Sequence, residues 1–518
     1  MHDLLLLGGA VFDGLGAPGR TADVAIEGDR VVAVGRDLGA ARRVIDVTGL
    51  SVTPGFVDAH AHSDGIPFMS EPQPFKLLQG VTTEIVGNCG FSLAPLTAAA
   101  AAHAREAWAG LFPEFEPEPM TFADYVERAS AAHPTNNLAP LVGHGTLRLS
   151  ANGMQRELAD GALGAMQDLA EEAMAAGATG VSSGLIYVPG TYADTDELVA
   201  VAAVAGRWGR PYTTHMRDES DHVVDSVSEA VEIGRRAGCR VQVSHCKISG
   251  TANWGRADQL LEVLHRARLD GVDVRGDQYP YMAGSTFLAA LLPPDALEGG
   301  FGRVRAAAAD PALLAELEAS FKPSTLWEPA APRHTTIVGH LDRSLVGRTL
   351  ADVAEESERD AFAVLCQLVA ADPGAAIVVH LMDEADVQRL MVDPLVAIGS
   401  DNGPPVGVQH PRTWGTFPWL LGEYVRRRGV LTQEAAVRKM TSATAAHFGL
   451  AHRGTLQAGS IADVAVFDPE TVDHAGTYAA PDAPPAGVPC VLLGGQVVVE
   501  DGEFSGARVG RMLRPGVA

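Results

Sequence analysis

Cysteine, long apolar runs and positive charge are all scarce in this chain, and each scarcity excludes a class of protein. Only five of the 518 residues are cysteine, an odd number that does not suit a disulfide framework. Lys and Arg number 39 against 64 Asp and Glu, which gives a net charge of −25. Such a charge argues against nucleic acid or an anionic membrane surface as a partner.

The apolar runs are too short for membrane insertion or export. The run Leu4 to Leu7 lacks a preceding basic stretch and is shorter than the core of a signal peptide. No apolar run approaches the length of a transmembrane helix. The chain also lacks a GxGxxG between a strand and a helix and lacks GxxxxGK[ST], so no nucleotide cradle is expected. We therefore expect a cytoplasmic protein.

The layout of the chain predicts a β-rich unit wrapped around an α/β unit. Residues 1–54 and 451–518 both carry alternating apolar residues between turn signals, as in LLLLGGAVFDG and VLLGGQVVVEDG. The two ends are expected to pair in one small β-sandwich. Residues 55–450 alternate short apolar runs with Ala-rich helical stretches, which favours a βα barrel or a doubly wound sheet. A Pro- and Ala-rich stretch at about 287–340 is predicted to be an inserted lid.

The segment PGFVDAHAHSDG, residues 54–65, carries the first chemical signal. An apolar run leads into His60 and His62, which are two residues apart where a strand is expected to end. Residues i and i+2 of a strand point to the same face, so both imidazoles would project together. Histidine is the commonest metal ligand, and this geometry suits one metal ion.

Other predicted strand ends supply possible partners for this pair. Four further residues lie where an apolar run meets a polar loop: Cys89, His215, His245 and Asp401. Thiolate, imidazole and carboxylate are the ligand types of zinc. In a barrel the chemistry lies at the carboxyl ends of the strands. The residues alone therefore predict a metal-dependent barrel hydrolase with one closed site or two neighbouring metal sites. His144 also ends an apolar run and is given no role.

Longer motifs make the chain resemble a known family. PGFVDAHAHSD, GVTTEIVGNCGFS, SSGLIYVPGTYADTDEL, THMRDE, SHCKISG with NWGR, QYPY, IGSDNGPP with HPRTWGTF, and GSIADVAVFD occur in order. Together they resemble the D-aminoacylases, which are N-acyl-D-amino-acid deacylases of the amidohydrolase superfamily. The resemblance implies an α/β fold, a distorted TIM-like (β/α)8 barrel with a small β-sandwich built from both termini.

The resemblance also implies roles for the candidate ligands. Cys89, His215 and His245 would hold one tight Zn²⁺, and His60, His62 and Asp401 match a second, weaker site. Zinc lowers the pKa of bound water and polarises a carbonyl. Asp401 is expected to act as the general base and then as the general acid in hydrolysis of an N-acyl-D-amino acid.

Binding of the substrate's α-carboxylate requires cations. Lys247 lies two residues after His245 and should share its face, and the planar guanidinium of Arg412 suits a carboxylate. The resemblance places Lys247, Tyr279 and Arg412 on the carboxylate, and Tyr187 near the scissile group.

The side-chain pocket is expected to be apolar. Residues 282–302 contain no Lys or Arg, and Phe287, Leu288 and Leu291 suggest a pocket for Met, Leu or Phe. The sequence LLPPDA departs from the family pattern, which has an aromatic residue near Asp295.

Two other interpretations stay open at this point. One is another amidohydrolase, either a cyclic-amide hydrolase such as a hydantoinase or a dipeptidase. These usually need a bridging carboxylated lysine, which no predicted strand end supplies convincingly. The other is a metal-binding barrel protein without catalytic activity. The oligomeric state is not predicted.

Overall fold

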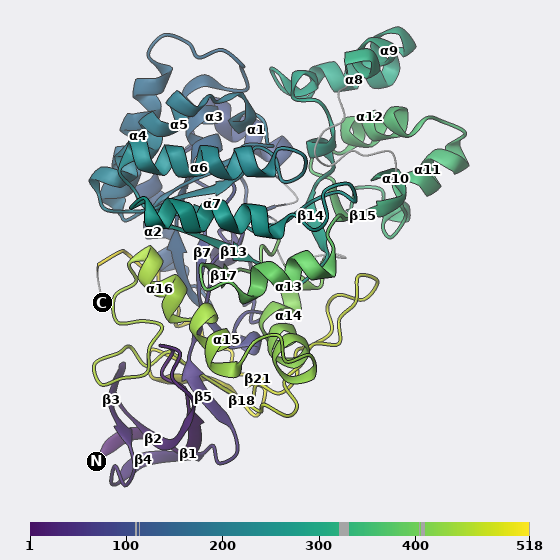
Figure 1. The fold of residues 1–518 in the computed structure, drawn as a ribbon. Helices are drawn as coiled ribbons and strands as arrows, with labels where there is room; N and C mark the ends of the chain where they lie inside the picture. The colour runs from purple at the N-terminus through teal and green to yellow at the C-terminus, as the bar shows by residue number, and fades with distance from the viewer. Residues whose placement is uncertain (109–110, 113, 321–330, 404, 406–409, 517–518) are drawn as a thin grey trace.

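One continuous sheet joins the two ends of the chain in the computed structural model, which describes residues 1–108, 111–112, 114–320, 331–403, 405 and 410–516. Its nine strands are β1 (His2–Val11), β2 (Arg20–Glu27), β3 (Arg30–Gly35), β4 (Ala41–Asp46), β5 (Ser51–Pro54), β18 (Val464–Phe467), β19 (Cys490–Leu493), β20 (Gln496–Glu500) and β21 (Glu503–Phe504). Strand β18 pairs antiparallel with β5, with Val466 opposite Val52. The predicted pairing of the two ends is therefore confirmed, and the sheet curls on itself at the bottom of Figure 1.

Alternation of apolar residues explains why this sheet forms. Leu4 and Leu6 of β1 and Val24 and Ile26 of β2 are two residues apart, so each pair points to one face. All four are buried in one apolar cluster, together with Val464 of β18. Residues far apart in the chain thus complete a single core.

The middle of the chain forms a barrel of parallel strands. These are β6 (Phe56–Asp58), β7 (Val81–Val86), β8 (Asn137–Pro140), β9 (Val142–Gly143), β10 (Val181–Gly184), β11 (Tyr212–His215), β12 (Val241–Val243), β13 (Val274–Gln278) and β17 (Val396–Ile398). They are hydrogen-bonded as a three-stranded arc, β6-β7-β8, and a six-stranded arc, β17-β13-β12-β11-β10-β9. Strands β8 and β9 flank Leu141 and occupy one position of the ring.

Backbone hydrogen bonds close the two arcs into a ring. Leu141 donates to Val86 at one end of the three-stranded arc, and at its other end Ala59 donates to Ile398 over 3.2 Å. Just beyond, Asp401 donates to His60 over 2.7 Å. The closure brings the ends of β6 and β17 together, and the predicted barrel is confirmed.

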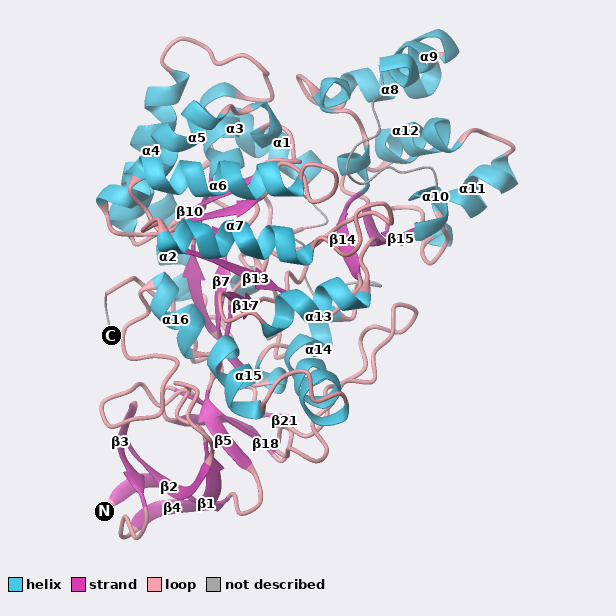
Figure 2. Cartoon of the chain, in the orientation of Figure 1, coloured by secondary structure: helices cyan, strands magenta, loops and turns pink. Residues whose placement is uncertain are grey.

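Helices cover the outside of the ring, as Figure 2 shows for α4 to α7. The helices that precede β13 in the chain are α1 (Ala98–Ala107), α2 (Phe122–Ala131), α3 (His144–Asn152), α4 (Ala162–Ala176), α5 (Thr195–Arg207), α6 (Val223–Ala237) and α7 (Ala257–Leu269). Later helices outside the insertion are α13 (Glu384–Val392), α14 (Arg412–Trp419), α15 (Gln433–Met440) and α16 (Ser442–Phe448). In α4, Met166, Ala170 and Ala173 recur at helical spacing and are fully buried against the barrel core.

A large insertion leaves the barrel after β13 and returns before β17. It contains a small antiparallel sheet of β14 (Ala283–Phe287), β16 (Ala376–His380) and β15 (Thr335–Gly339). Its helices are α8 (Gly302–Ala309), α9 (Pro311–Ser320), α10 (Ala331–His334), α11 (Leu350–Ser357) and α12 (Ala361–Ala371). They form the lobe at the right of Figure 1. The predicted lid, 287–340, lies within this insertion, except that 321–330 fall outside the described residues.

Among the helices of the described residues, none combines the length and the apolar character needed to cross a membrane.

Candidate metal centre and adjoining pockets

The predicted ligands converge at the carboxyl ends of the barrel strands. His60 and His62 follow β6, Cys89 follows β7, and His215 is the last residue of β11. His245 and Asp401 follow β12 and β17. All six side chains are buried or nearly so.

Cys89 lies at the centre of three imidazoles. Its Sγ is 3.3 Å from Nε2 of His60, 3.4 Å from Nε2 of His245 and 3.7 Å from Nδ1 of His215. Burial opposes ionisation of the thiol, yet the charges of His60 and His245 hold the pKa of Cys89 well below its ordinary value. A thiolate among imidazoles is the donor set that zinc prefers.

Asp401, which follows β17, lies next to two of the histidines. Its Oδ1 is 3.3 Å from Nε2 of His62 and 3.5 Å from Nε2 of His60. The same His60 nitrogen therefore faces both Cys89 and Asp401. Ligand atoms of His60, Cys89, His245 and Asp401 all lie within 4.8 Å of one another. The two predicted ligand groups are thus adjacent, with His60 between them.

The backbone is strained where three of these residues lie. Cys89, His245 and Asp401 have φ angles of 53°, 35° and 51°, in a region that non-glycine residues seldom adopt. Close packing accompanies the first of these turns, because a Cβ on Gly184 would lie 2.0 Å from the carbonyl oxygen of Cys89. Strain of this kind concentrates at functional sites.

Glu219 is a buried carboxylate at the centre that the sequence analysis missed. Its Oε1 lies 2.9 Å from Nδ1 of His245 and accepts a hydrogen bond of 2.6 Å from Nζ of Lys247. Its Oε2 is 3.8 Å from Nε2 of His215. Burial alone would raise the pKa of Glu219, but Lys247 and the two histidines hold it well below its ordinary value. Glu219 follows His215 by four residues in a loop, so no strand periodicity pointed to it.

A second buried network holds the ends of β6 and β17 together. Oδ1 of Asp58 accepts hydrogen bonds from the backbone N–H groups of His60 and Ser400, over 3.1 and 2.8 Å. Nζ of the fully buried Lys76 donates to Oδ2 of Asp58 over 2.5 Å and to Oγ of Ser400 over 2.7 Å. The residues next to two candidate ligands are therefore fixed to each other.

Arg412, at the start of α14, reaches the same centre. Its Nη1 lies 2.9 Å from Oδ2 of Asp401, and its Nη2 donates to the carbonyl of Ser285 over 3.1 Å. Its Nε has no hydrogen-bond partner among the described residues. The ring of Tyr279 is 4.7 Å from Cζ of Arg412 and 5.7 Å from Nζ of Lys247. The three predicted carboxylate-binding residues are therefore neighbours.

Tyr187 lies over the centre from the loop after β10. Its ring packs edge-on against His215 at 5.1 Å between centroids, and its hydroxyl lies 2.8 Å from Oγ1 of Thr286. Burial holds the pKa of the phenol well above its ordinary value. Tyr187 is thus a neutral hydroxyl close to the candidate ligands.

Two pockets open onto the centre. The first, called here the arginine pocket, spans about 560 Å³ including its open side. Its lining includes His62, Cys89, Phe91, Leu111, Tyr187, Phe287, Ala376, Asp401 and Arg412. The second, called the lysine pocket, spans about 380 Å³. Its lining includes Ile186, Tyr187, His215, His245, Lys247, Tyr279, Val379, Leu381 and Asp401.

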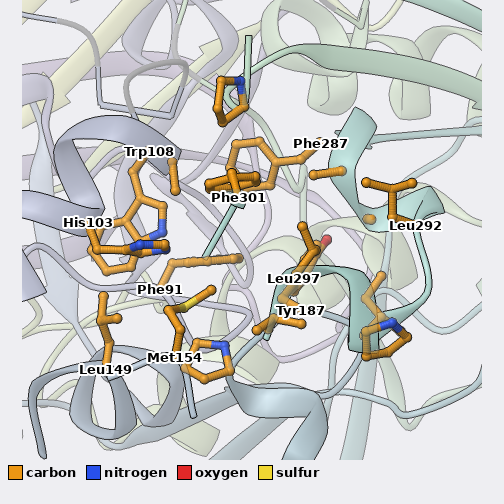
Figure 3. A pocket seen from close by; sticks show the side chains of 18 residues that line it. Phe91, His103, Trp108, Leu149, Met154, Tyr187, Phe287, Leu292, Leu297 and Phe301 are labelled. Atoms are coloured by element: carbon orange, nitrogen blue, oxygen red, sulfur yellow. The ribbon is translucent and has the colours of Figure 1, made fainter. Parts of the chain in front are cut away.

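A third cavity of about 610 Å³ adjoins them and is lined almost wholly by apolar side chains. Ten of the residues around this apolar cavity are labelled in Figure 3: Phe91, His103, Trp108, Leu149, Met154, Tyr187, Phe287, Leu292, Leu297 and Phe301. It shares Phe91, Tyr187 and Phe287 with the arginine pocket.

The structure also shows where Asp295, His144 and the residues expected to form the side-chain pocket lie. Phe287 faces two of the pockets, but Leu288 and Leu291 are fully buried in the hydrophobic core and line none of the three spaces described above. Asp295 pairs with Arg156 on the surface of the insertion. His144 contacts Glu197 over 2.9 Å as a buried, partnered histidine.

Comparison with known proteins places this geometry in context. The model of the "Amidohydrolase family" matches residues 43–499. A D-aminoacylase of Alcaligenes xylosoxydans xylosoxydans is 41% identical over 520 residues, which cover 99% of this chain and 97% of that protein.

Solved structures of deacylases are also similar to this chain. A crystal structure of a D-aminoacylase superposes with a TM-score of 0.86 at 38% identity, covering 99% of this chain and 100% of the other. An N-acyl-D-glutamate deacylase of Bordetella bronchiseptica, complexed with zinc and a phosphonate inhibitor, gives 0.83 at 36% identity, with 99% of each chain covered.

Proposed function

This chain belongs to the amidohydrolase family, and from that premise we propose that it is a zinc-dependent deacylase of N-acyl-D-amino acids. The products are a carboxylate and a free D-amino acid. The observation that carries the proposal is the meeting of a zinc-type donor set with a buried carboxylate–guanidinium pair, Asp401 and Arg412. The residues proposed to hold a catalytic metal and those proposed to bind an anionic substrate are therefore neighbours.

The donor set fits zinc by its chemistry. Cys89, His215 and His245 are the residues that we propose for the tight ion, and His60, His62 and Asp401 are those for a second, weaker one. When bound, zinc acts as a Lewis acid that lowers the pKa of water and polarises a carbonyl. The carboxylate of Glu219 at Nδ1 of His245 would fix the orientation of that ring.

Asp401 is the proposed proton carrier of the reaction. Water attacks the carbonyl carbon of the amide, and Oδ1 or Oδ2 of Asp401 accepts the proton that the water loses. The C–N bond then breaks as the same carboxyl group gives that proton to the leaving nitrogen. The first step needs the carboxyl group of Asp401 ionised, so that it can accept the proton. Burial opposes this, but Arg412 and the neighbouring histidines hold the pKa of Asp401 well below its ordinary value.

The α-carboxylate of the substrate is proposed to bind between the two cations beside Tyr279. Nε of Arg412, which has no hydrogen-bond partner within the part of the chain that the structure describes, supplies a donor for it. Lys247 adds positive charge from the neighbouring pocket. Tyr187 is proposed to donate its hydroxyl proton towards the scissile carbonyl. A positioned neutral donor of this kind stabilises negative charge as it develops on the carbonyl oxygen.

An apolar side chain on the amino acid is the proposed preference. The side chain and the α-carboxylate branch from the same carbon, so the side chain must lie in a pocket that also holds a cation. In the arginine pocket, Arg412 is accompanied by Phe91, Leu111 and Phe287. Contact with these groups favours Met, Leu or Phe over an acidic side chain.

Metal removal and return tests the proposal directly. The chain is freed of metal with a chelator and then titrated with Zn²⁺ while hydrolysis of N-acetyl-D-methionine is followed. The proposal predicts no hydrolysis without metal and recovery as zinc binds. Undiminished hydrolysis by the metal-free chain would refute the zinc-dependent mechanism.

A further inference from the structure

The proposed reaction assigns no role to the apolar cavity. It lies between the barrel and the insertion. His103 of α1 and Trp108, which follows that helix, lie on one side, and Leu292 and Leu297 of the insertion lie on another (Figure 3). His103 stacks on Phe301 with ring centroids 5.8 Å apart and an angle of 4° between the planes. Aromatic and aliphatic walls therefore enclose a space that spans about 610 Å³ with its open side.

This cavity differs from the two pockets at the metal centre in its charge. The arginine pocket contains Arg412, and the lysine pocket contains Lys247. Among the described residues that line the apolar cavity, none is Asp, Glu, Lys or Arg. Its one titratable base, His103, has a pKa held below its ordinary value by burial, so the ring is neutral near pH 7.

The covalent structure of an N-acyl amino acid then indicates which part of the substrate binds in the charged pockets and which part binds in the apolar cavity. The carboxylate and the side chain share a carbon, so both belong with the cations. The acyl chain leaves from the opposite side of the scissile carbonyl and bears no charge. Phe91, Tyr187 and Phe287 line both the arginine pocket and the apolar cavity, so the cavity begins beside the centre where that carbonyl must lie.

Resting on the proposed function, we propose that the apolar cavity binds the acyl chain and that the enzyme acts on D-amino acids bearing medium-chain aliphatic acyl groups. An acetyl methyl would leave most of the cavity unused. Each further methylene buried there should raise kcat/KM by up to about fourfold, the transfer free energy of one methylene expressed as a ratio.

A substrate series with two matched variants tests this assignment. N-Acetyl-, butyryl-, hexanoyl- and octanoyl-D-alanine vary the acyl arm, and N-acetyl-D-alanine, -methionine and -phenylalanine vary the side chain. Ala290→Leu places a larger side chain in the apolar cavity and so narrows it. Ala376→Leu narrows the arginine pocket by the same increase in side-chain volume. The unfolding temperature of each variant verifies that it folds.

We expect kcat/KM to rise at least tenfold from acetyl to octanoyl in the unaltered enzyme. Ala290→Leu should remove most of that ratio, whereas Ala376→Leu should change the side-chain series instead. A flat acyl series with normal hydrolysis of the acetyl substrates would overturn the inference and leave the proposed function standing. A change in the side-chain series caused by Ala290→Leu would overturn it as well.

Calorimetric titration with octanoate separates the two possible failures. If no N-acyl-D-amino acid is hydrolysed, the proposed function is wrong. Octanoate binding that Ala290→Leu abolishes would still support the cavity as an acyl-chain site. Absence of octanoate binding to the unaltered protein would then overturn the inference too.

Discussion

The guanidinium of Arg412 lies against the carboxylate of Asp401, with Nη1 2.9 Å from Oδ2. Both groups are buried, and Asp401 also faces His60 and His62. One residue proposed to bind the substrate is thus in contact with the residue proposed to move the proton. Binding of a substrate carboxylate to Arg412 would therefore change the electrostatic environment of Asp401.

Replacement of Arg412 by lysine should weaken substrate binding. A lysine keeps the charge but loses the planar set of N–H donors that can hold two carboxylates at once. We expect KM for N-acetyl-D-methionine to rise roughly 10- to 100-fold, the cost of one charge-assisted hydrogen bond. Arg389→Lys is the matched control, because Arg389 pairs with Asp258 on the surface. Similar KM values for both variants would contradict the carboxylate role.

Replacement of Asp401 by asparagine should remove turnover and keep the tight metal. The amide has nearly the same shape but accepts no proton, so kcat should fall by roughly 10² to 10⁴. Cys89, His215 and His245 are unaltered, and zinc content measured by mass spectrometry should stay near one ion per chain or above. A kcat close to that of the unaltered enzyme would exclude Asp401 as the general base.

Cys89→Ser should impair zinc binding more than any substitution of another cysteine. A serine hydroxyl does not ionise at neutral pH, so the thiolate donor at the centre is lost. Cys246→Ala is the control, because Cys246 is buried next to His245 but its Sγ contacts the carbonyl of Val243. Equal zinc contents in the two variants would show that Cys89 is not a ligand.

Glu219→Gln should weaken zinc binding through His245. The substitution removes the charge that lies 2.9 Å from Nδ1 of His245 and that also pairs with Nζ of Lys247. Loss of such a supporting carboxylate typically reduces metal affinity 10- to 100-fold. Glu197→Gln provides the comparison, since Glu197 also contacts a buried histidine and an arginine away from the centre. Competition with a chelator measures both affinities, and the account predicts a loss only in Glu219→Gln.

Lys439 should make stability depend on pH in the alkaline range. Burial lowers its pKa to about 8, although its Nζ donates to the carbonyls of Asp393 and Val396. Between pH 8 and the ordinary lysine value the unfolded chain binds more protons, so stability rises with pH in that interval. From pH 7.5 to 9.5, the unaltered protein should gain about 2 kcal/mol relative to Lys439→Met. Urea unfolding at both pH values tests this, and an unchanged difference would show that the pKa of Lys439 is not lowered.

The sequence predicted the site wherever strand periodicity was enough. His215 ends β11, so its direction follows from the strand, and His60 and His62 come directly after the end of β6. The pairing of the chain ends was also visible, because both carry the same alternating pattern. These features depend on short stretches of chain.

The missed features depend on how distant segments meet. Glu219 reaches His245 only through the path of the loop after β11, and Lys76 lies beside a short turn after β6. Leu288 and Leu291 were interpreted as pocket residues because they are apolar and follow Phe287. A tight helical turn, Leu288–Leu291, directs them into the core instead, and spacing alone could not reveal that turn.

The initial rate of hydrolysis of N-acetyl-D-methionine against N-acetyl-L-methionine by the zinc-loaded enzyme tests the central claim most directly. The account predicts hydrolysis of the D-isomer at least 100-fold faster. Arg412 orients the α-carboxylate, Asp401 and the metal ligands orient the amide, and the apolar residues of the arginine pocket orient the side chain, so three groups on one carbon have fixed directions. Equal rates, or no hydrolysis of either isomer by a folded, zinc-containing protein, would contradict it and direct attention to cyclic amides and dipeptides.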